Sequence, residues 1–461
     1  MSQTGAFDDD HPPQLALVED CVHCGFCLPS CPTYELWGEE MDSPRGRIHL
    51  MKQGLEGQPL TAAMAGHFDR CLGCMACVSA CPSGVQYDAL IEQTRAQVER
   101  RHERSRGERL LRSAIFAVFP YPRRLRMLRG PLRFYQRSGL ARILRRLGLL
   151  DRLPAALRAM EAVAPPLEAR PPRLPGRVPA IGPARGVVGL LTGCVQSVFF
   201  PGVNAATANV LAAEGFDVII PPDQGCCGAL SSHMGRRGEA ARFARDVISR
   251  FEEAEVSDVI VNAAGCGSAM KEYGRLLADD PAWAARADRL AARTRDVTEF
   301  LAAHEPRAVR HPLPISVAYH DACHLAHAQG IRAQPRDLLR TIPGLSVREI
   351  ADGSLCCGSA GVYNLLQPEA AAELGSRKAA RVLETGADLL VTANPGCLMQ
   401  INAALSQTGG EPMPSAHTIE VLDAAVRGVP AAALLSSGTE RGSPRAVVLS
   451  EDADDDVSAG S

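Results

Sequence analysis

The sequence predicts a mixed α/β protein in which an N-terminal α-helical domain precedes two repeated, parallel α/β domains. Three observations predict this fold class. Eight of the 16 cysteines form two runs of identical spacing near the N-terminus. The other eight recur as two matched quartets in the C-terminal half. Around each quartet, apolar strand-like runs alternate with helical patterns, which is typical of parallel α/β units.

Composition narrows the class of protein. The chain has 461 residues, is 46% hydrophobic and 22% charged, and so is neither wholly disordered nor fibrous. A net charge of −3 and 5% aromatic residues give no support for a nucleic-acid partner. No apolar run approaches the ~18 residues of a membrane-spanning helix, and the acidic start lacks the core of a secretory signal. We therefore expect a cytoplasmic protein whose cysteines serve metal or redox chemistry.

The two N-terminal runs each read C-x2-C-x2-C-x3-C-P. They consist of Cys21, Cys24, Cys27, Cys31 and Pro32, and of Cys71, Cys74, Cys77, Cys81 and Pro82. In two-cluster ferredoxins the fourth thiolate of each such run ligates the other cluster. One [4Fe–4S] cluster is therefore assigned to Cys21, Cys24, Cys27 and Cys81, and a second to Cys71, Cys74, Cys77 and Cys31. Structural zinc, the alternative, normally pairs two separated C-x2–4-C halves.

Helices are expected between and after these runs. Ser43-Pro44 can open one that ends near Gly57, and another carries the apolar stripe from Tyr87 to Val98. Residues 1–94 are therefore predicted to form an α-helical, ferredoxin-like domain. Arg45 and Arg47 lie on its first long helix, either beside an anionic cluster or as ordinary surface charge.

The next segment, residues 95–184, is predicted to be an arginine-rich helical region followed by a linker. Residues 95–158 hold 18 Arg against three Glu and one Asp, and proline is dense from Pro165 to Pro183. One helical face carries Leu140, Ile143, Leu144, Leu147 and Leu150, while Arg142, Arg145 and Arg146 project elsewhere. Such a helix can lie in a membrane interface, which would place the protein peripherally on the inner face of the cytoplasmic membrane. Packing on its own domains or on a partner subunit is the alternative.

The C-terminal half repeats itself with an offset of about 130 residues. The quartets are Cys194, Cys226, Cys227 and Cys266, and Cys323, Cys356, Cys357 and Cys397. Both contain Cys-Cys-Gly (CCG), and corresponding gaps differ by a single residue. The cysteines follow predicted strands, and ligands of open α/β sheets gather at the carboxyl ends of strands. We expect two cysteine-rich CCG domains, at 185–295 and 296–427.

The chemistry of the quartets stays open at this level. Each could bind an iron–sulfur cluster or zinc, exchange thiols for disulfides, or serve as small buried apolar side chains. His320 and His324 flank Cys323 and are candidates for a tuning role. Residues 428–461 end in EDADDDVSAGS and are expected to be a disordered acidic tail.

With both halves in view, the chain resembles the iron–sulfur subunit of glycolate oxidase (glycolate dehydrogenase). The resemblance spans about residues 15–425. It rests on CVHCGFCLPSCPTYELWGEEMDSPRGRIHLMKQ, DRCLGCMACVSACPSGVQYDALIE, GCGSAMKEYG, LCCGSAGVYNL and VTANPGC. A wider group with this architecture includes subunits of anaerobic glycerol-3-phosphate dehydrogenase, lactate-utilisation proteins and heterodisulfide reductase.

The resemblance implies an electron-transfer subunit without catalytic residues of its own. It implies two [4Fe–4S] clusters on the eight N-terminal cysteines, FAD-binding flavoprotein partners that oxidise glycolate to glyoxylate, and a membrane quinone as acceptor. The alternatives are the same role in a D-lactate or glycerol-3-phosphate dehydrogenase, or a heterodisulfide-reductase-like thiol–disulfide catalyst. In the heterodisulfide reductase relatives the CCG motif ends with C-x-x-C. Here Ala263 and Asn394 replace its first cysteine, which disfavours a five-thiolate cluster.

Overall fold

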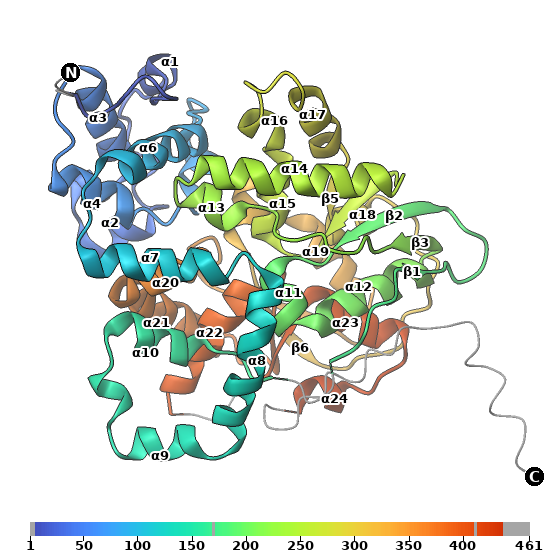
Figure 1. Cartoon of the computed structure of the whole chain (residues 1–461). Coiled ribbons are helices and arrows are strands. Elements are labelled where there is room, and N and C mark those ends of the chain that lie inside the picture. Colours follow the sequence, from blue (N-terminus) through green and yellow to red (C-terminus); the bar gives the residue numbers. More distant parts are fainter. Residues whose placement is uncertain (1–4, 168–170, 410–412, 437–461) are drawn as a thin grey trace, which may run out of the picture.

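The computed structural model describes residues 5–167, 171–409 and 413–436 and has a mixed α/β fold (Figure 1). The N-terminal part is helical, as predicted. Its helices are α1 (Leu15–Glu19), α2 (Pro32–Trp37), α3 (Pro44–Leu55), α4 (Ala62–Arg70), α5 (Ala76–Ala80) and α6 (Tyr87–Arg101).

The two long helices expected in this part form for the reasons that the sequence suggests. The Ser43 hydroxyl accepts a hydrogen bond from the Gly46 amide at 3.0 Å and caps α3, and Pro44 occupies its first turn. Apolar side chains of α3, α4 and α6, among them Met51, Phe68 and Leu90, are fully buried against one another. The loops that carry the two cysteine runs pack against this core.

Four helices form the arginine-rich segment. They are α7 (Arg106–Val118), α8 (Pro122–Arg137), α9 (Leu140–Arg146) and α10 (Ala155–Val163). Figure 1 shows that α9 lies at the periphery, away from both sheets. Its apolar residues Leu140 and Ile143 are exposed, and so is Leu147 beyond its end. Leu144 and Leu150 of the same predicted face are half-buried, so this face is only partly packed on the rest of the chain.

Two sheets carry the CCG quartets, and their strand orders match. The first is β1-β3-β2-β4-β5 and the second is β7-β6-β8-β9. All neighbours pair in parallel except β1 with β3. The strands are β1 (Arg177–Val178), β2 (Gly186–Leu191), β3 (Phe216–Ile219), β4 (Asp258–Val261), β5 (Thr294–Asp296), β6 (Ser316–His320), β7 (Ser346–Glu349), β8 (Leu389–Thr392) and β9 (Ser415–His417).

Helices alternate with these strands in both repeats, as the sequence pattern predicts. The first repeat has α11 (Cys194–Phe199), α12 (Pro201–Ala213), α13 (Ala229–His233), α14 (Arg237–Glu253), α15 (Ala264–Lys271), α16 (Tyr273–Leu276), α17 (Ala284–Ala292) and α18 (Val297–Ala302). The second has a π-helical turn (His324–Ala328), α19 (Ala333–Arg340), α20 (Tyr363–Leu366), α21 (Pro368–Glu384), α22 (Pro395–Gln407), α23 (Thr418–Val426) and α24 (Ala431–Leu435).

The structure corrects two expectations and adds two strands. Within the proline-dense linker, β1 joins the edge of the first sheet. In the predicted disordered tail, α24 forms and buries Leu434, while residues 437–461 lie outside the described residues. Strands β5 and β9 were not predicted, because each has three residues and no apolar run.

The two repeats share one core. Helix α12 of the first repeat packs on α23 of the second, and α18 packs on α19. Leu190 and Ile260 of the first sheet belong to the same buried cluster as Tyr319 and Val391 of the second. Burial of this joint apolar surface fixes the sheets relative to each other. No helix in the described ranges combines the length and apolarity needed to cross a membrane.

Candidate functional site

The first candidate centre is a small cavity lined by the four cysteines that the spacing assigns to one cluster. Cys71, Cys74 and Cys77 come from the junction of α4 and α5, and Cys31 directly precedes α2. All four are buried. The last cysteine of the first run thus lies with the first three of the second run. This is the arrangement that an exchange of ligands between runs requires, and an all-thiol donor set suits iron–sulfur chemistry.

The complementary set lies at the protein surface. Cys21, Cys24 and Cys27 occupy the loop between α1 and α2, and Cys81 follows α5. Burial and the neighbouring thiols of Cys81 and Cys24 raise the pKa of Cys21, so Cys81 lies beside the first run. Cys24 is exposed, whereas Cys27 and Cys81 are half-buried. The two predicted sets therefore differ in depth.

Cys71 of the buried set has polar and charged neighbours. Its sulfur accepts hydrogen bonds from the Gly73 amide at 3.4 Å and from the Tyr87 hydroxyl at 3.6 Å. Burial alone would raise the pKa of this thiol, but the guanidinium groups of Arg47 and Arg95 outweigh it and lower the pKa. The surroundings favour the thiolate, which is the form that binds iron.

Arg47 is a buried partner of these thiols and not surface charge. Its side chain is 1% exposed and donates to the His67 carbonyl at 2.7 Å and to the Thr33 hydroxyl at 3.2 Å. Arg45, two residues earlier, pairs with Glu40 at 2.6 Å and covers the loop of the first run. Of the two roles that the sequence left open, the structure favours proximity to the cysteines for both arginines, at different runs.

Arg95 and Tyr87 were missed as site residues. Arg95 donates to the Cys71 carbonyl, and also to the His233 carbonyl of the first CCG domain at 2.8 Å. It lies at the boundary of an arginine-rich stretch, so composition gave no reason to single it out. Tyr87 was expected only as part of an apolar stripe, and its hydroxyl contact depends on tertiary packing.

The first CCG quartet gathers at the carboxyl edge of the first sheet, as expected. Interactions with the thiols of Cys194 and Cys227 raise the pKa of Cys226. Cys227 in turn contacts Cys266, at the start of α15. The Gly228 amide donates to the Cys226 sulfur at 3.3 Å. The four thiols thus form one continuous group.

The second quartet gathers in the same way and includes a histidine. The sulfurs of Cys323 and Cys356 are 3.9 Å apart. Donor atoms of Cys357, Cys397 and His320 all lie within 4.8 Å of one another. All five side chains are buried. The structure therefore brings His320, but not His324, to the thiols.

This second quartet adjoins the buried ferredoxin-type set. Cys74, Cys323 and Cys356 belong to one buried apolar cluster with Leu72 and Tyr363. Burial and the nearby Cys323 thiol raise the pKa of Cys74 well above its usual value. The N-terminal domain and the second CCG domain are therefore in direct contact through their cysteines.

His324 joins three parts of the chain. Its Nε2 lies 3.0 Å from the Gly73 carbonyl and its Nδ1 lies 2.7 Å from the Ser268 hydroxyl. Because a carbonyl only accepts, Nε2 carries the hydrogen and Nδ1 accepts from Ser268. Burial, more than the neighbouring His233, lowers the His324 pKa to about 3, so the ring is neutral. Its role is to position the Gly73 loop.

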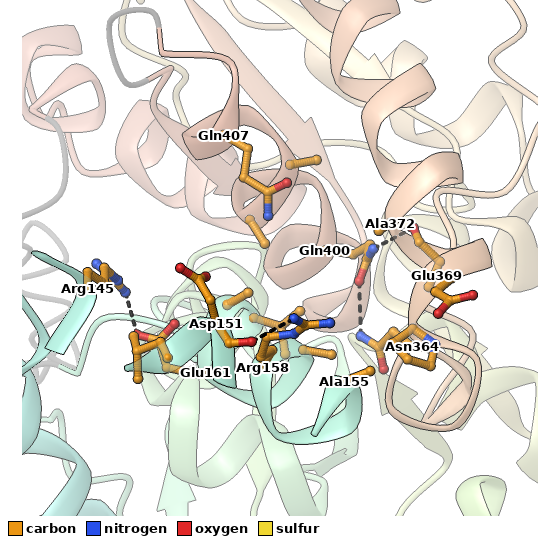
Figure 2. Close-up of a pocket in the computed structure, with 18 residues that line it drawn as sticks. Arg145, Asp151, Ala155, Arg158, Glu161, Asn364, Glu369, Ala372, Gln400 and Gln407 are labelled. Carbon is orange, nitrogen blue, oxygen red and sulfur yellow. Dashed lines mark hydrogen bonds and ion pairs between the residues drawn. The ribbon is translucent and has the colours of Figure 1, made fainter. Parts of the chain in front are cut away.

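A larger cleft lies away from the cysteines. It has a volume of about 480 Å³ and separates α10 from α20–α22 (Figure 2). Figure 2 shows the hydrogen bond that Asn364 donates to Gln400. Gln400 also donates to the Ala371 carbonyl, so both amides are engaged within the second CCG domain. None of the described residues that line the cleft is a cysteine. The cleft therefore stands apart from the metal chemistry.

Three family models match four parts of the chain. A 4Fe–4S dicluster domain matches residues 17–85, and a cysteine-rich CCG domain matches residues 188–271 and 317–402. The model described as the linker region of the glycolate oxidase iron–sulfur subunit matches residues 107–164. The helical segment between the domains thus has a counterpart in that protein.

Whole-chain relatives agree with these matches. The chain is 40% identical to a probable glycolate oxidase iron–sulfur subunit of Bacillus subtilis, over 85% of this chain and 89% of the relative. It is 36% identical to the glycolate oxidase iron–sulfur subunit of Escherichia coli, over 84% and 91%. A lactate utilization protein A of Exiguobacterium is 32% identical over 52% of this chain and 98% of its own. The chain belongs to the family of glycolate oxidase iron–sulfur subunits.

Proposed function

We propose that this chain is the electron-transfer subunit of a glycolate dehydrogenase complex. FAD-binding partner subunits oxidise glycolate to glyoxylate, and this chain passes the electrons toward a membrane quinone. The observation that carries the proposal is the convergence of Cys31 with Cys71, Cys74 and Cys77 around one cavity. That convergence supports a dicluster centre, and the family supplies the substrate.

Two [4Fe–4S] clusters are assigned to the N-terminal domain. Cys21, Cys24, Cys27 and Cys81 would hold the exposed one, and Cys31, Cys71, Cys74 and Cys77 the buried one. When bound, such clusters supply one-electron carriers. The chain's own residues hold the thiolates, exclude water from the buried set and donate hydrogen bonds to its sulfurs.

The surface around the first run suits a redox partner. Cys24 is exposed, and the neighbouring Val22 and Phe26 side chains are largely exposed as well. Apolar side chains beside an exposed redox centre favour docking of a protein partner. We assign this surface to the flavoprotein, so that electrons reach the exposed centre first and the buried centre second.

Oxidation of the hydroxy acid itself is assigned to the partner subunits. None of the described residues that line the buried cysteine cavity is a carboxylate or a histidine. Nothing there would take the proton from a hydroxy acid as it is oxidised. A thiol–disulfide catalyst is disfavoured, because seven of the eight CCG cysteines are buried and Cys266 is half-buried.

Peripheral membrane contact is assigned to α9, at the cytoplasmic face. Its exposed Leu140 and Ile143 alternate with Arg142, Arg145 and Arg146, a composition that favours an anionic lipid surface. A lactate dehydrogenase complex is the second candidate, favoured by the lactate utilization relatives. The electron-transfer role would be the same in both.

The test is anaerobic reduction of the clusters by glycolate. The purified chain, its flavoprotein partners and glycolate are mixed, and reduced-cluster EPR signals are recorded. We expect signals only when flavoprotein and glycolate are both present, and none with the chain and glycolate alone. Glycolate oxidation by the chain alone with a dye acceptor would contradict the proposal. Reduction by D-lactate and not by glycolate would favour the second candidate.

A further inference from the structure

The two CCG repeats can be compared position by position. An added Cβ at Gly228 would meet Ala240 and Phe243 of α14, and one at Gly358 would meet the equivalent Ala371 and Leu374 of α21. Equivalent contacts recur with a shift of one residue, and the order of the four shared strands is the same. Where equivalent buried positions beside the two quartets carry different residues, we therefore infer that the two quartets bind different groups.

Two such differences face the second quartet. His320, the last residue of β6, is 1% exposed, and its equivalent Leu191 ends β2 in the first repeat. Lys378 on α21 is 2% exposed, and its equivalent on α14 is the fully buried Val247. The second repeat thus places an imidazole and an ammonium group where the first repeat has aliphatic side chains.

His320 is buried without a hydrogen-bond partner. Neither ring nitrogen has one among the described residues. A buried polar atom without a partner is costly, and native proteins rarely leave one. Its donor atom and the sulfurs of Cys357 and Cys397 lie within 4.8 Å of one another. An ion bound between them would satisfy the ring.

We propose that the second CCG domain binds one zinc ion through His320, Cys357 and Cys397. The adjacent Cys323–Cys356 pair, with sulfurs 3.9 Å apart, supplies the fourth ligand as one thiolate. The site is a closed tetrahedral one with one nitrogen and three sulfur donors, the class that stabilises folded domains. The first quartet offers only sulfur donors, so it is not a site with one nitrogen and three sulfur ligands.

The spacing of the donors favours a single ion over a cluster. Bond lengths of about 2.0 Å to nitrogen and 2.3 Å to sulfur place the ligands of one tetrahedral zinc roughly 3.5–3.8 Å apart. A small closure of the present arrangement reaches this spacing. A four-iron cluster instead distributes its ligands over separate iron atoms, so its donors stand farther apart.

The charges also fit a zinc ion. A divalent ion with three thiolates and a neutral imidazole carries one net negative charge. Lys378 is fixed by its hydrogen bond to the Asp352 carbonyl at 2.7 Å, and its charge acts on the Cys356 and Cys357 thiols. A buried ammonium group offsets that charge without reaching solvent. The first repeat has no equivalent of this pair of residues.

The two repeats would then have different roles. Zinc does not change oxidation state, so the second CCG domain would be a structural clamp beside Cys74 and no part of the electron path. The proposal does not depend on the substrate of the complex. It also leaves the assignment of the N-terminal clusters unchanged.

The test measures zinc and iron together. The full chain is purified anaerobically and both metals are determined by mass spectrometry. We expect about one zinc per chain, and less than about a tenth of that in H320L and C397S, with iron unchanged. H320L copies Leu191 of the first repeat, and unchanged iron reports an intact fold. The matched control C266S, at the equivalent of Cys397, retains its zinc.

X-ray absorption at the zinc edge needs no variant. The unaltered chain should show about one nitrogen and three sulfur neighbours around zinc. Absence of zinc from the chain, coordination by sulfur alone, or full zinc retention in both H320L and C397S would overturn the proposal. Absence of iron from the unaltered chain would instead count against the proposed function and leave the zinc result standing.

Discussion

Replacing Tyr87 by Phe should lower the reduction potential of the buried centre. The hydroxyl donates to the Cys71 sulfur at 3.6 Å, and the ring is otherwise packed in the N-terminal core. A hydrogen bond to a charged acceptor contributes about 1.5–3 kcal/mol, and it is stronger in the reduced state, which carries one more negative charge. If about 1 kcal/mol of it is specific to that state, the loss corresponds to about 40 mV for one electron.

An anaerobic redox titration followed by EPR measures this shift. We expect a decrease of about 40 mV at one of the two centres and none at the other. Tyr273→Phe is the matched control, because it removes a buried hydroxyl that donates to the Cys227 carbonyl at 2.7 Å, in the first CCG domain. Equal shifts in both variants, or an unchanged potential in Tyr87→Phe, would refute the assignment of this hydrogen bond.

Two further predictions concern membrane contact and domain packing. Changing the three arginines of α9 to Glu should abolish co-sedimentation with anionic vesicles, and unchanged binding would contradict a membrane role for this helix. Gly235→Ala should lower the melting temperature by at least about 3 °C, because Gly235 has a φ of 77° and an added Cβ would overlap the Arg95 carbonyl. Gly238→Ala, where an added Cβ meets nothing within 4 Å, is the control and should not destabilise the protein.

The spacing of the cysteines predicted that Cys31 lies with Cys71, Cys74 and Cys77, and these four residues line one cavity. Their assignment to a cluster stays a prediction. In two-cluster ferredoxins the last cysteine of each run binds the cluster of the other run. The sequence alone was therefore enough to assign Cys31 to the second cluster and Cys81 to the first. The strands that consist of apolar runs could also be predicted from the sequence. Strands β1, β5 and β9 were not, because two or three residues pair with a sheet only after the neighbouring strand is in place.

The side chains around the cysteines were harder to predict. Arg45 and Arg47 lie two residues apart on one helix, and only the packing of α3 shows that Arg47 faces Cys71 and Arg45 faces the first run. Comparison of the two repeats, by contrast, could have identified one of these side chains from the sequence. Aligning His320 with Leu191 would have marked the histidine as an exception in an otherwise apolar position.

The most direct test of the central claim is iron and acid-labile sulfide per chain, measured on anaerobically purified protein. The assignment of two [4Fe–4S] clusters to the N-terminal domain predicts about eight or more of each. Serine at Cys31 should remove about four of each. Iron near zero in the unaltered chain, with zinc bound at the N-terminal cysteines instead, would contradict the electron-transfer function.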